Sequence, residues 1–184
     1  MSILKIARMG HPILKVKATP VEDPTAPDIA ALVENMIETM HDAGGTGLAA
    51  PQVHVPLRVV VFTVYPQRDQ REGGEGQGVP LTVLINPEIE PLSDEKAFGW
   101  EGCLSIPTMM GEVPRFTRIR YSAYDLHGQR FEREASGFHA RVVQHECDHL
   151  DGILYPYRIE DMSRFGFAEE LSRQGPNDRP DEED

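Results

Sequence analysis

The sequence predicts an α+β protein with one main domain. Two segments with helical spacing, residues 25–43 and 136–150, enclose a middle region that is rich in β-forming residues. Helices and sheets in this arrangement bury their apolar faces against each other. The length of 184 residues fits a single domain, and the 40% hydrophobic residues can form a sizeable core.

The first predicted helix covers residues 25–43. Apolar residues recur there every three or four positions, which places them on one face of a helix. Thr25, Pro27 and Asp28 are start signals, and Gly44 is a stop signal. We therefore expect an amphipathic helix in this segment.

Strands are predicted in the middle of the chain. The β-rich runs are residues 58–64, 82–85, 117–126 and 129–134. His127 and Gly128 separate the last two runs and favour a tight hairpin turn. Residues 67–78 are polar and rich in glycine, so we expect a mobile loop there.

The second predicted helix runs from a cap at Ser136 to Leu150, and a shorter helix is expected at residues 162–171. Beyond residue 174 the chain is acidic, contains two prolines and has no aliphatic or aromatic side chain. Because such a segment has no apolar surface to bury, we expect residues 175–184 to form a disordered acidic tail. Residues 1–174 are then the folded domain.

Composition and charge exclude several classes of partner. The formal net charge is −12, which would repel nucleic acid phosphates and an anionic membrane surface. No stretch approaches the roughly 18 consecutive apolar residues of a membrane span, and the first residues lack the pattern of a signal peptide. The sequence thus predicts a cytoplasmic protein with no membrane partner. Two cysteines are too few for a disulfide framework.

The second helix carries the motif His145-Glu146-Cys147-Asp148-His149. Histidines four residues apart project from one face of a helix, so both can bind a single cation. Glu146 lies beside them and can accept a proton from a water molecule that the cation has made more acidic. The same spacing also arises by chance in ordinary helices, so a third ligand is needed to decide.

A catalytic site with three protein ligands and one open position requires a donor from outside this helix. Tyr155 stands where the metzincin pattern has its third histidine, which argues against that class. Candidate downstream carboxylates, as in other zinc proteases, are Glu160, Glu169 and Glu170. Cys103 offers a soft thiolate, and Gly102 beside it allows the backbone to approach a crowded site closely.

A third element, residues 45–52, follows the first helix. Its glycines and alanines are too small to build a core, but they allow the backbone to run beside a ligand. Gln52 adds a fixed amide donor. Ala50 breaks the GxGxxG pattern and no strand precedes the segment, so it is not a phosphate-binding loop.

Together these motifs resemble the three signature motifs of peptide deformylase. In chain order they are Gly45-x-Gly47-x-Ala49-Ala50-x-Gln52, Glu101-Gly102-Cys103-Leu104-Ser105 and His145-Glu146-x-Asp148-His149. The likeness extends from about residue 10 to about residue 159. Thr46 and Cys147 depart mildly from the usual pattern, in which a branched aliphatic residue and Leu or Met are common. Neither departure removes a catalytic group.

The resemblance implies antiparallel β-sheets packed around a central helix that carries the HExxH motif, and it implies a complete active site. The implied metal ligands are Cys103, His145 and His149. The implied catalytic groups are the general base Glu146 and two oxyanion donors, the Gln52 amide and the Leu104 N–H. The implied substrate-binding residues are Gly47 and Gly102. The metal would be one Fe²⁺ per chain, replaceable by Zn²⁺, Ni²⁺ or Co²⁺.

The implied activity is removal of the formyl group from the N-terminal formylmethionine of newly synthesised polypeptides, with release of formate. Nascent N-formylmethionyl peptides would be the substrates, met in a transient encounter with the ribosome. A bacterial cytoplasmic protein is the first expectation, and a mature organellar form is the alternative. The acidic charge makes direct binding to nucleic acid unexpected.

Two other functions stay open on the residues alone. One is a zinc endopeptidase that uses a downstream glutamate, and the other is a non-catalytic protein with a structural metal. Cys147 is expected to be core packing, because three protein ligands and a water already fill a tetrahedral site. Glu101 and Arg115 are either a pair behind the ligands or a surface ion pair. Met109 and Met110 either line a pocket or pack.

Overall fold

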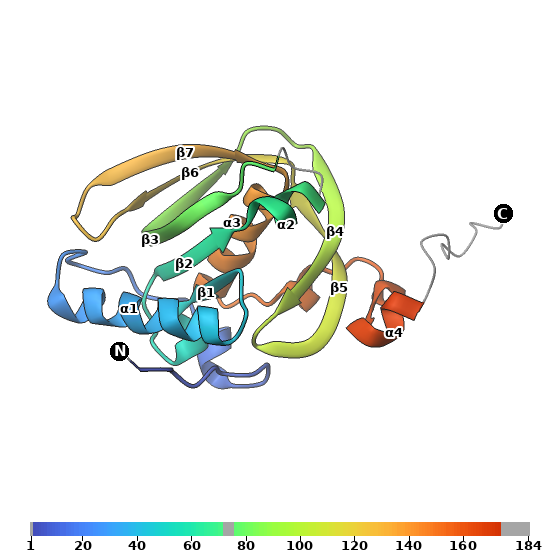
Figure 1. Ribbon diagram of the computed structural model, residues 1–184, viewed down its shortest axis with the longest axis horizontal. Coiled ribbons are helices and arrows are strands. Elements are labelled where there is room, and N and C mark those ends of the chain that lie inside the picture. The colour runs from blue at the N-terminus through green and yellow to red at the C-terminus, as the bar shows by residue number, and fades with distance from the viewer. Residues whose placement is uncertain (1, 72–75, 174–184) are drawn as a thin grey trace.

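The structure is a computed structural model that describes residues 2–71 and 76–173. Its strands form two antiparallel sheets, one of five strands in the order β1-β2-β3-β6-β7 and one of three in the order β4-β5-β8 (Figure 1). The strands are β1 (Gly47–Ala49), β2 (Val59–Val64), β3 (Val79–Pro91), β4 (Lys96–Cys103), β5 (Ile106–Phe116), β6 (Arg118–Tyr124), β7 (Arg130–Ser136) and β8 (Phe165–Phe167).

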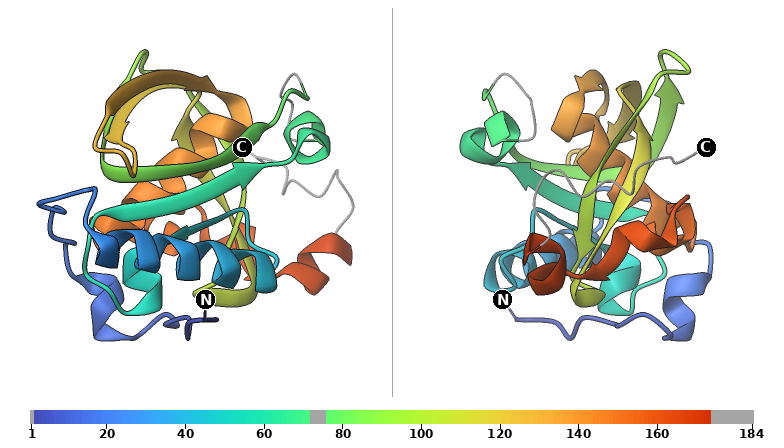
Figure 2. Two further views of the ribbon diagram at one scale, coloured as in Figure 1. Left: turned by 60° about the vertical axis from the view of Figure 1, so that its left-hand side comes forward. Right: turned by 90° about the vertical axis from the view of Figure 1, so that its right-hand side faces the viewer.

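The helices lie around and between these sheets. The α-helices are α1 (Pro27–Asp42), α2 (Pro66–Arg71), α3 (Gly137–Leu150) and α4 (Ala168–Arg173). The short 3₁₀ turns are η1 (Pro12–Lys15), η2 (Ala50–Val53), η3 (Tyr155–Arg158) and η4 (Met162–Arg164). The β6–β7 hairpin arches over α3, the helix with the HExxH motif (Figure 2). The predicted α+β class, with antiparallel sheets around this helix, is confirmed.

Strand β2 is buried on both faces and divides the core into two clusters. Because successive side chains of a strand point to opposite sides, Val60 and Phe62 pack in the α3 cluster, while Val59 and Val61 pack in the α1 cluster. This two-sided burial explains the continuous apolar run that predicted the strand. The central helix is thereby packed against a strand that is covered on both faces.

The two long helices were predicted nearly to their ends. Helix α1 begins with Pro27 in its first turn and ends just before Gly44, whose φ of +65° suits a glycine. Helix α3 begins directly after Ser136, although the Ser136 side chain makes no capping hydrogen bond. The predicted hairpin at His127 and Gly128 is also confirmed, with β6 and β7 as its strands.

Three predictions about local structure were wrong. The expected loop at residues 67–78 begins as helix α2, and residues 72–75 lie outside the described part of the chain. The expected helix at residues 162–171 is divided into η4, β8 and α4, because β8 pairs with β5 through Phe167 opposite Met109. Ala49 and Ala50 are fully buried core residues, so small side chains do build the core there.

Sequence reasoning did not find strands β4 and β5. Strand β5 contains Pro107 and Pro114, and β4 contains Gly99 and Gly102, all of which lower strand propensity. Their long hairpin nevertheless pairs from Lys96 opposite Phe116 down to Cys103. The predicted acidic tail at residues 175–184 and the domain end at residue 174 lie outside the described residues. Within residues 2–71 and 76–173, no helix is long and apolar enough to cross a membrane.

Candidate metal centre

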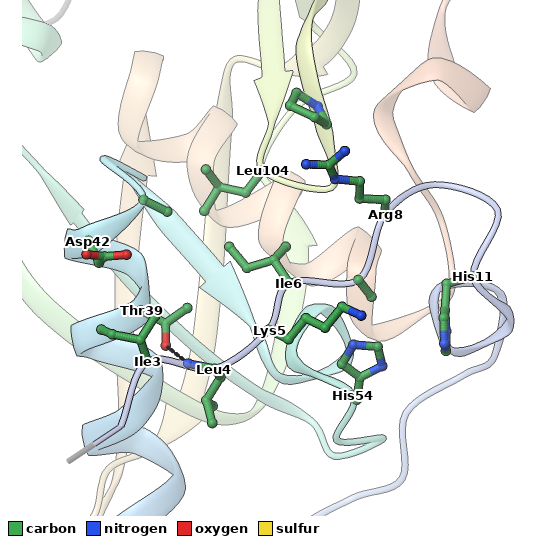
Figure 3. Close-up of a pocket in the computed structure, with 13 residues that line it drawn as sticks. Ile3, Leu4, Lys5, Ile6, Arg8, His11, Thr39, Asp42, His54 and Leu104 are labelled. Carbon is green, nitrogen blue, oxygen red and sulfur yellow. Dashed lines mark hydrogen bonds between the residues drawn. The ribbon is translucent and has the colours of Figure 1, made fainter.

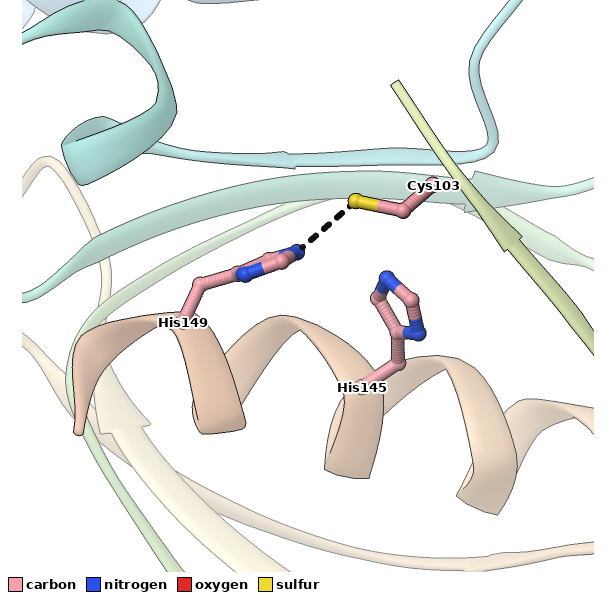
Figure 4. A group of neighbouring side chains, drawn as sticks. All are labelled: Cys103, His145 and His149. Carbon is pink, nitrogen blue, oxygen red and sulfur yellow. Dashed lines mark hydrogen bonds between the residues drawn. The ribbon is translucent and has the colours of Figure 1, made fainter. Parts of the chain in front are cut away.

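Two separate elements bring the three predicted metal ligands together. Cys103 lies at the end of β4, and His145 and His149 project from one face of α3 (Figure 4). All three ligand atoms lie within 4.8 Å of one another, and Sγ of Cys103 is 3.4 Å from Nε2 of His149. One thiolate and two imidazoles suit a transition metal, and three protein donors leave one coordination position open. The donor set therefore fits a catalytic cation.

The downstream carboxylates do not join this group. Among the described residues, the cluster consists of Cys103 and the two histidines, without Glu160, Glu169 or Glu170. Glu169 and Glu170 instead pair with Arg173 within α4. The geometry thus gives no support to the zinc-endopeptidase alternative, in which one of these glutamates would be the third ligand.

Glu101 fixes the orientation of the first histidine. Its Oε2 lies 2.8 Å from Nδ1 of His145, which leaves Nε2 of that ring for a metal. Arg115 binds the same carboxylate at 2.8 Å and 2.9 Å. Both members of this pair are buried, so the interpretation as a pair behind the ligands is confirmed, and the surface ion pair is wrong. Burial alone would raise the pKa of Glu101. Its hydrogen bonds to Arg115 and His145, and their charges, outweigh burial and hold this pKa well below its usual value.

The electrostatics of the histidines favour a cation. Burial, together with the charge on His145, lowers the pKa of His149 well below its usual value, so the ring is neutral and able to coordinate. Burial also opposes charge on His145, but Cys103 and Glu101 raise its pKa well above the usual value. The partners that attract a proton to this site also attract a metal ion.

Glu146 lies beside the cluster and is buried. Burial raises its pKa to about 7, and no group in the described part of the chain hydrogen-bonds its Oε2. A carboxylate with a pKa near neutrality is well suited to accept and return a proton. The Gly47 backbone packs so closely that a Cβ atom there would overlap this carboxylate. Gly102, by contrast, is exposed and has room for a Cβ atom, so the protein itself does not crowd that position.

Gln52 is held in one orientation. Its Oε1 accepts a hydrogen bond from the Ala49 N–H at 2.9 Å. Its Nε2 donates to Oγ of Ser105 at 3.1 Å and to Sγ of Cys103 at 3.4 Å. Because the oxygen is already engaged, the amide presents its N–H groups to the metal cluster.

A cleft of about 450 Å³ opens beside the cluster. Among its lining residues are Gly45, Gly47, Gly102, Cys103, Leu104, Met109, Met110, Phe138, Arg141 and His145. Both methionines line this cleft, and Met109 also packs against a small apolar cluster around Tyr155. A second hollow of about 830 Å³, between residues 3–8 and the end of α1, shares Leu104 and Pro107 with the cleft (Figure 3). Leu104 and Pro107 thus contribute to both hollows.

Sequence reasoning missed several residues around the centre. Asp148, inside the motif itself, accepts hydrogen bonds from Arg115 at 2.5 Å and from Arg158 at 2.6 Å. Tyr155 stacks on His145 with ring centroids 6.1 Å apart. The sequence did hold one signal of such buried pairs, which is Arg141, one helical turn before His145. A charged side chain on the inner face of a buried helix needs a partner. Cys147 packs in the core, as expected.

A helix with an HExxH motif, joined to a cysteine from a separate strand, defines a class of metal-dependent hydrolases. The comparison with protein families gives the particular family. The polypeptide deformylase family matches residues 3–165, and the chain belongs to this family. Its members are metalloenzymes that remove the formyl group from the N-terminal formylmethionine of new polypeptides.

The curated relatives and the solved structures that are similar to this chain are also peptide deformylases. Peptide deformylase 2 of Ralstonia nicotianae is 53% identical over 174 residues, covering 95% of this chain and 97% of that protein. Peptide deformylase 1 of Bordetella pertussis is 56% identical over 166 residues, covering 90% and 93%. A class I type b peptide deformylase from Acinetobacter baumannii, bound to Met-Ala-Ser, has a TM-score of 0.78 and 37% identity, covering 86% and 99%. A peptide deformylase from Ehrlichia chaffeensis has a TM-score of 0.79 and 35% identity, covering 89% and 91%.

Proposed function

We propose that the cleft beside Cys103, His145 and His149 is the deformylase active site and that Fe²⁺ is its resident cation. The observation that carries this proposal is the meeting of three ligand atoms, from a strand and a helix, within 4.8 Å of one another. Cys103 would bind through Sγ, and both histidines would bind through Nε2. When bound, the cation polarises the formyl carbonyl and lowers the pKa of water.

The chain's own residues handle the proton and the developing charge. Glu146 accepts a proton from the attacking water and returns it to the leaving amine, a task that its raised pKa of about 7 supports. The formyl oxygen gains negative charge as the carbonyl is attacked. The Gln52 amide and the Leu104 backbone N–H donate hydrogen bonds to that oxygen, and such donors are worth about 2.7–4 kcal/mol each in other enzymes.

The cleft accounts for the choice of substrate. Formyl is the smallest acyl group, so a crowded site rejects acetyl groups sterically. Met109, Met110 and Phe138 supply an adaptable apolar lining for a methionine side chain. Gly47 and Gly102 pair through their backbones with the extended substrate, which makes binding tolerant of the residues that follow. The Met-Ala-Ser bound to the Acinetobacter baumannii enzyme supports peptides of this kind as ligands here.

The cellular setting follows from this substrate. Nascent chains carry formylmethionine as they leave the ribosome, so a transient encounter there, in the cytoplasm, gives access to it. The charge of −12 supports contact through the nascent peptide or a basic protein rather than through RNA. We further propose that residues 1–174 contain the whole catalytic domain. A chain truncated after residue 174 should then keep its turnover of a short formylated peptide.

The activity is tested with protein purified anaerobically and loaded with Fe²⁺, by measuring formate released from formyl-Met-Ala-Ser. We expect Cys103→Ala to lose both metal and activity. Cys147→Ala is the matched control, because it removes a thiol from the same region without touching the ligand cluster. Retained metal in Cys103→Ala would overturn the ligand assignment. Cleavage of internal peptide bonds in an unformylated peptide, abolished by Glu169→Ala, would instead support the endopeptidase.

A further inference from the structure

Arg141 makes an unusual set of contacts for a residue on a buried helix. It lies one turn before His145 on α3 and is 9% exposed. Its Nη1 donates to Oε1 of Glu101 at 2.9 Å and to the carbonyl oxygen of Val113 at 2.8 Å. Its Nη2 donates to the carbonyl oxygen of Ala97 at 2.7 Å. One guanidinium thus joins the helix to both strands of the β4–β5 hairpin.

The hairpin is shaped to receive this guanidinium. Gly99 lies on β4, and its carbonyl oxygen also faces Nη1 of Arg141, at 3.3 Å. A Cβ atom at position 99 would lie 2.7 Å from Nη2 and 2.8 Å from Cζ of Arg141. A guanidinium with this many partners cannot move aside freely, so the glycine and the arginine are sterically matched.

The two joined elements are those that carry the metal ligands. Strand β4 ends at Cys103, and α3 holds His145 and His149. The separation of hairpin and helix therefore sets the distance between the sulfur and the two imidazoles. Arg141 spans this separation close to the cluster, and because its side chain is only 11% exposed, solvent weakens its charge-assisted hydrogen bonds little.

Arg141 also acts on the ligand cluster through Glu101. Oε1 of that carboxylate accepts from Arg115 at 2.8 Å and from Arg141 at 2.9 Å, while Oε2 faces Nδ1 of His145. Two guanidinium groups on one oxygen fix the rotation of the carboxylate. The other oxygen is thereby directed at the imidazole, which sets the ring orientation.

We propose that Arg141 is a positioning residue for the metal centre: its guanidinium sets the spacing between the cysteine strand and the histidine helix and holds Glu101 against His145. This inference rests on the proposed metal site and concerns how tightly that site holds its cation. It assigns Gly99 a matching role as the residue that leaves space for the guanidinium.

The test measures the binding of Co²⁺ and the absorption spectrum of the bound ion. This spectrum reports both the coordination geometry and the bond to sulfur. We compare wild type with Arg141→Leu, which removes the guanidinium but keeps an apolar side chain on the helix. Because Arg115 still holds Glu101, we expect about tenfold weaker Co²⁺ binding, at the low end of the range for residues behind metal ligands. We also expect the absorption bands of bound Co²⁺ to shift. Both are measured well below the melting temperature, with a competing chelator for the affinity.

Gly99→Ala is an independent way to remove the guanidinium from its contacts. It takes the place of Arg141→Leu in the test if that variant fails to fold. Its new methyl group should displace the guanidinium and weaken Co²⁺ binding. The double variant should bind no more weakly than Arg141→Leu alone, because the displaced group is already absent. Additive losses of affinity would contradict the steric match.

Arg164→Leu is the matched control. Arg164 also binds the β4–β5 hairpin, through Glu112 at 3.2 Å, but it does not contact Glu101. We expect its Co²⁺ affinity and spectrum to equal those of wild type. If Arg141→Leu lowers the melting temperature yet binds Co²⁺ with wild-type affinity and spectrum, Arg141 is only a packing residue and the inference fails. If wild type binds no Co²⁺, the proposed metal site fails instead.

Discussion

Gly47 and Glu146 occupy adjoining space so tightly that a Cβ atom at position 47 would overlap the Glu146 carboxylate. Gly47 lies on β1 and Glu146 on α3, so the contact joins the strand beside the cleft to the helix that carries the proposed base. The glycine therefore makes room for the carboxylate, in addition to its proposed pairing with the substrate backbone. Both roles require the absence of a side chain.

We predict that Gly47→Ala lowers kcat by at least tenfold while the metal content stays at one ion per chain. The methyl group should push the carboxylate away from its working position, and misplacement by about 1 Å can cost 10²-fold in rate. Gly166→Ala is the control, because a Cβ atom there makes ordinary contacts with Leu171. If Gly47→Ala is as active as Gly166→Ala, the close packing of Gly47 against the Glu146 carboxylate does not affect catalysis.

Glu146→Gln should bind metal and fold normally but lose most of its activity. The amide keeps the size of the carboxylate, yet it cannot accept and return a proton. General acid–base groups contribute typically 10²–10⁴-fold, so we expect a loss of kcat in that range. Metal analysis and kcat with formyl-Met-Ala-Ser are measured on the same preparation. Near-full activity at saturating metal would remove Glu146 from the mechanism.

The parts of the fold that followed from sequence are those with strong periodicity. Helix α1 repeats apolar residues on one face, α3 carries two histidines at helical spacing, and β2 is a continuous apolar run because both of its faces are covered. The β4–β5 hairpin has no such signal. Its prolines and glycines lower the strand propensity of both segments, and their pairing depends on the rest of the fold. Strand β8 likewise forms only because β5 lies beside it.

The candidate site, like the fold, was predictable from the sequence only in part. The spacing of His145 and His149 was enough to place both on one helix face. Cys103 was one of several candidates, and only the family resemblance selected it, because its approach to α3 is a tertiary contact. The link from Glu101 through Arg115 to Asp148 was not predictable in full, since a sequence does not show which charged residues are buried.

The Fe²⁺ form should lose activity in air. Cys103 would place an oxidisable thiolate on a redox-active metal, beside a coordination position open to small molecules. We expect catalase, a reductant or replacement by Ni²⁺ to protect the enzyme, and we expect the Zn²⁺ form to be stable but less active. Half-lives of activity in air, measured for the Fe²⁺, Ni²⁺ and Zn²⁺ forms, decide the matter. Equal half-lives and equal activities for the Fe²⁺ and Zn²⁺ forms would contradict the prediction.

His139 should make the fold less stable under mildly acidic conditions. It lies on α3 near Phe62, and its Nε2 is 3.1 Å from the hydroxyl of Tyr121. Burial, aided by Arg133, lowers its pKa to about 4 from the usual 6.5. The Tyr121 hydroxyl can hydrogen-bond either form of the ring, so burial and the charge of Arg133 are what oppose protonation of His139. Between pH 6.5 and pH 4 the unfolded chain therefore binds a proton at this position that the folded chain does not, and stability falls as pH falls.

This loss is measured by urea unfolding at pH 7 and pH 5, for wild type and for His139→Gln. A pKa of about 4 in the folded state predicts that wild type loses about 2 kcal/mol more than the variant between these two pH values. Glutamine does not titrate and can still accept a hydrogen bond from Tyr121. Metal release and the other titrating groups affect both proteins alike, so the difference between them isolates His139. If both proteins lose the same stability, His139 takes up its proton equally well in the folded and unfolded chain.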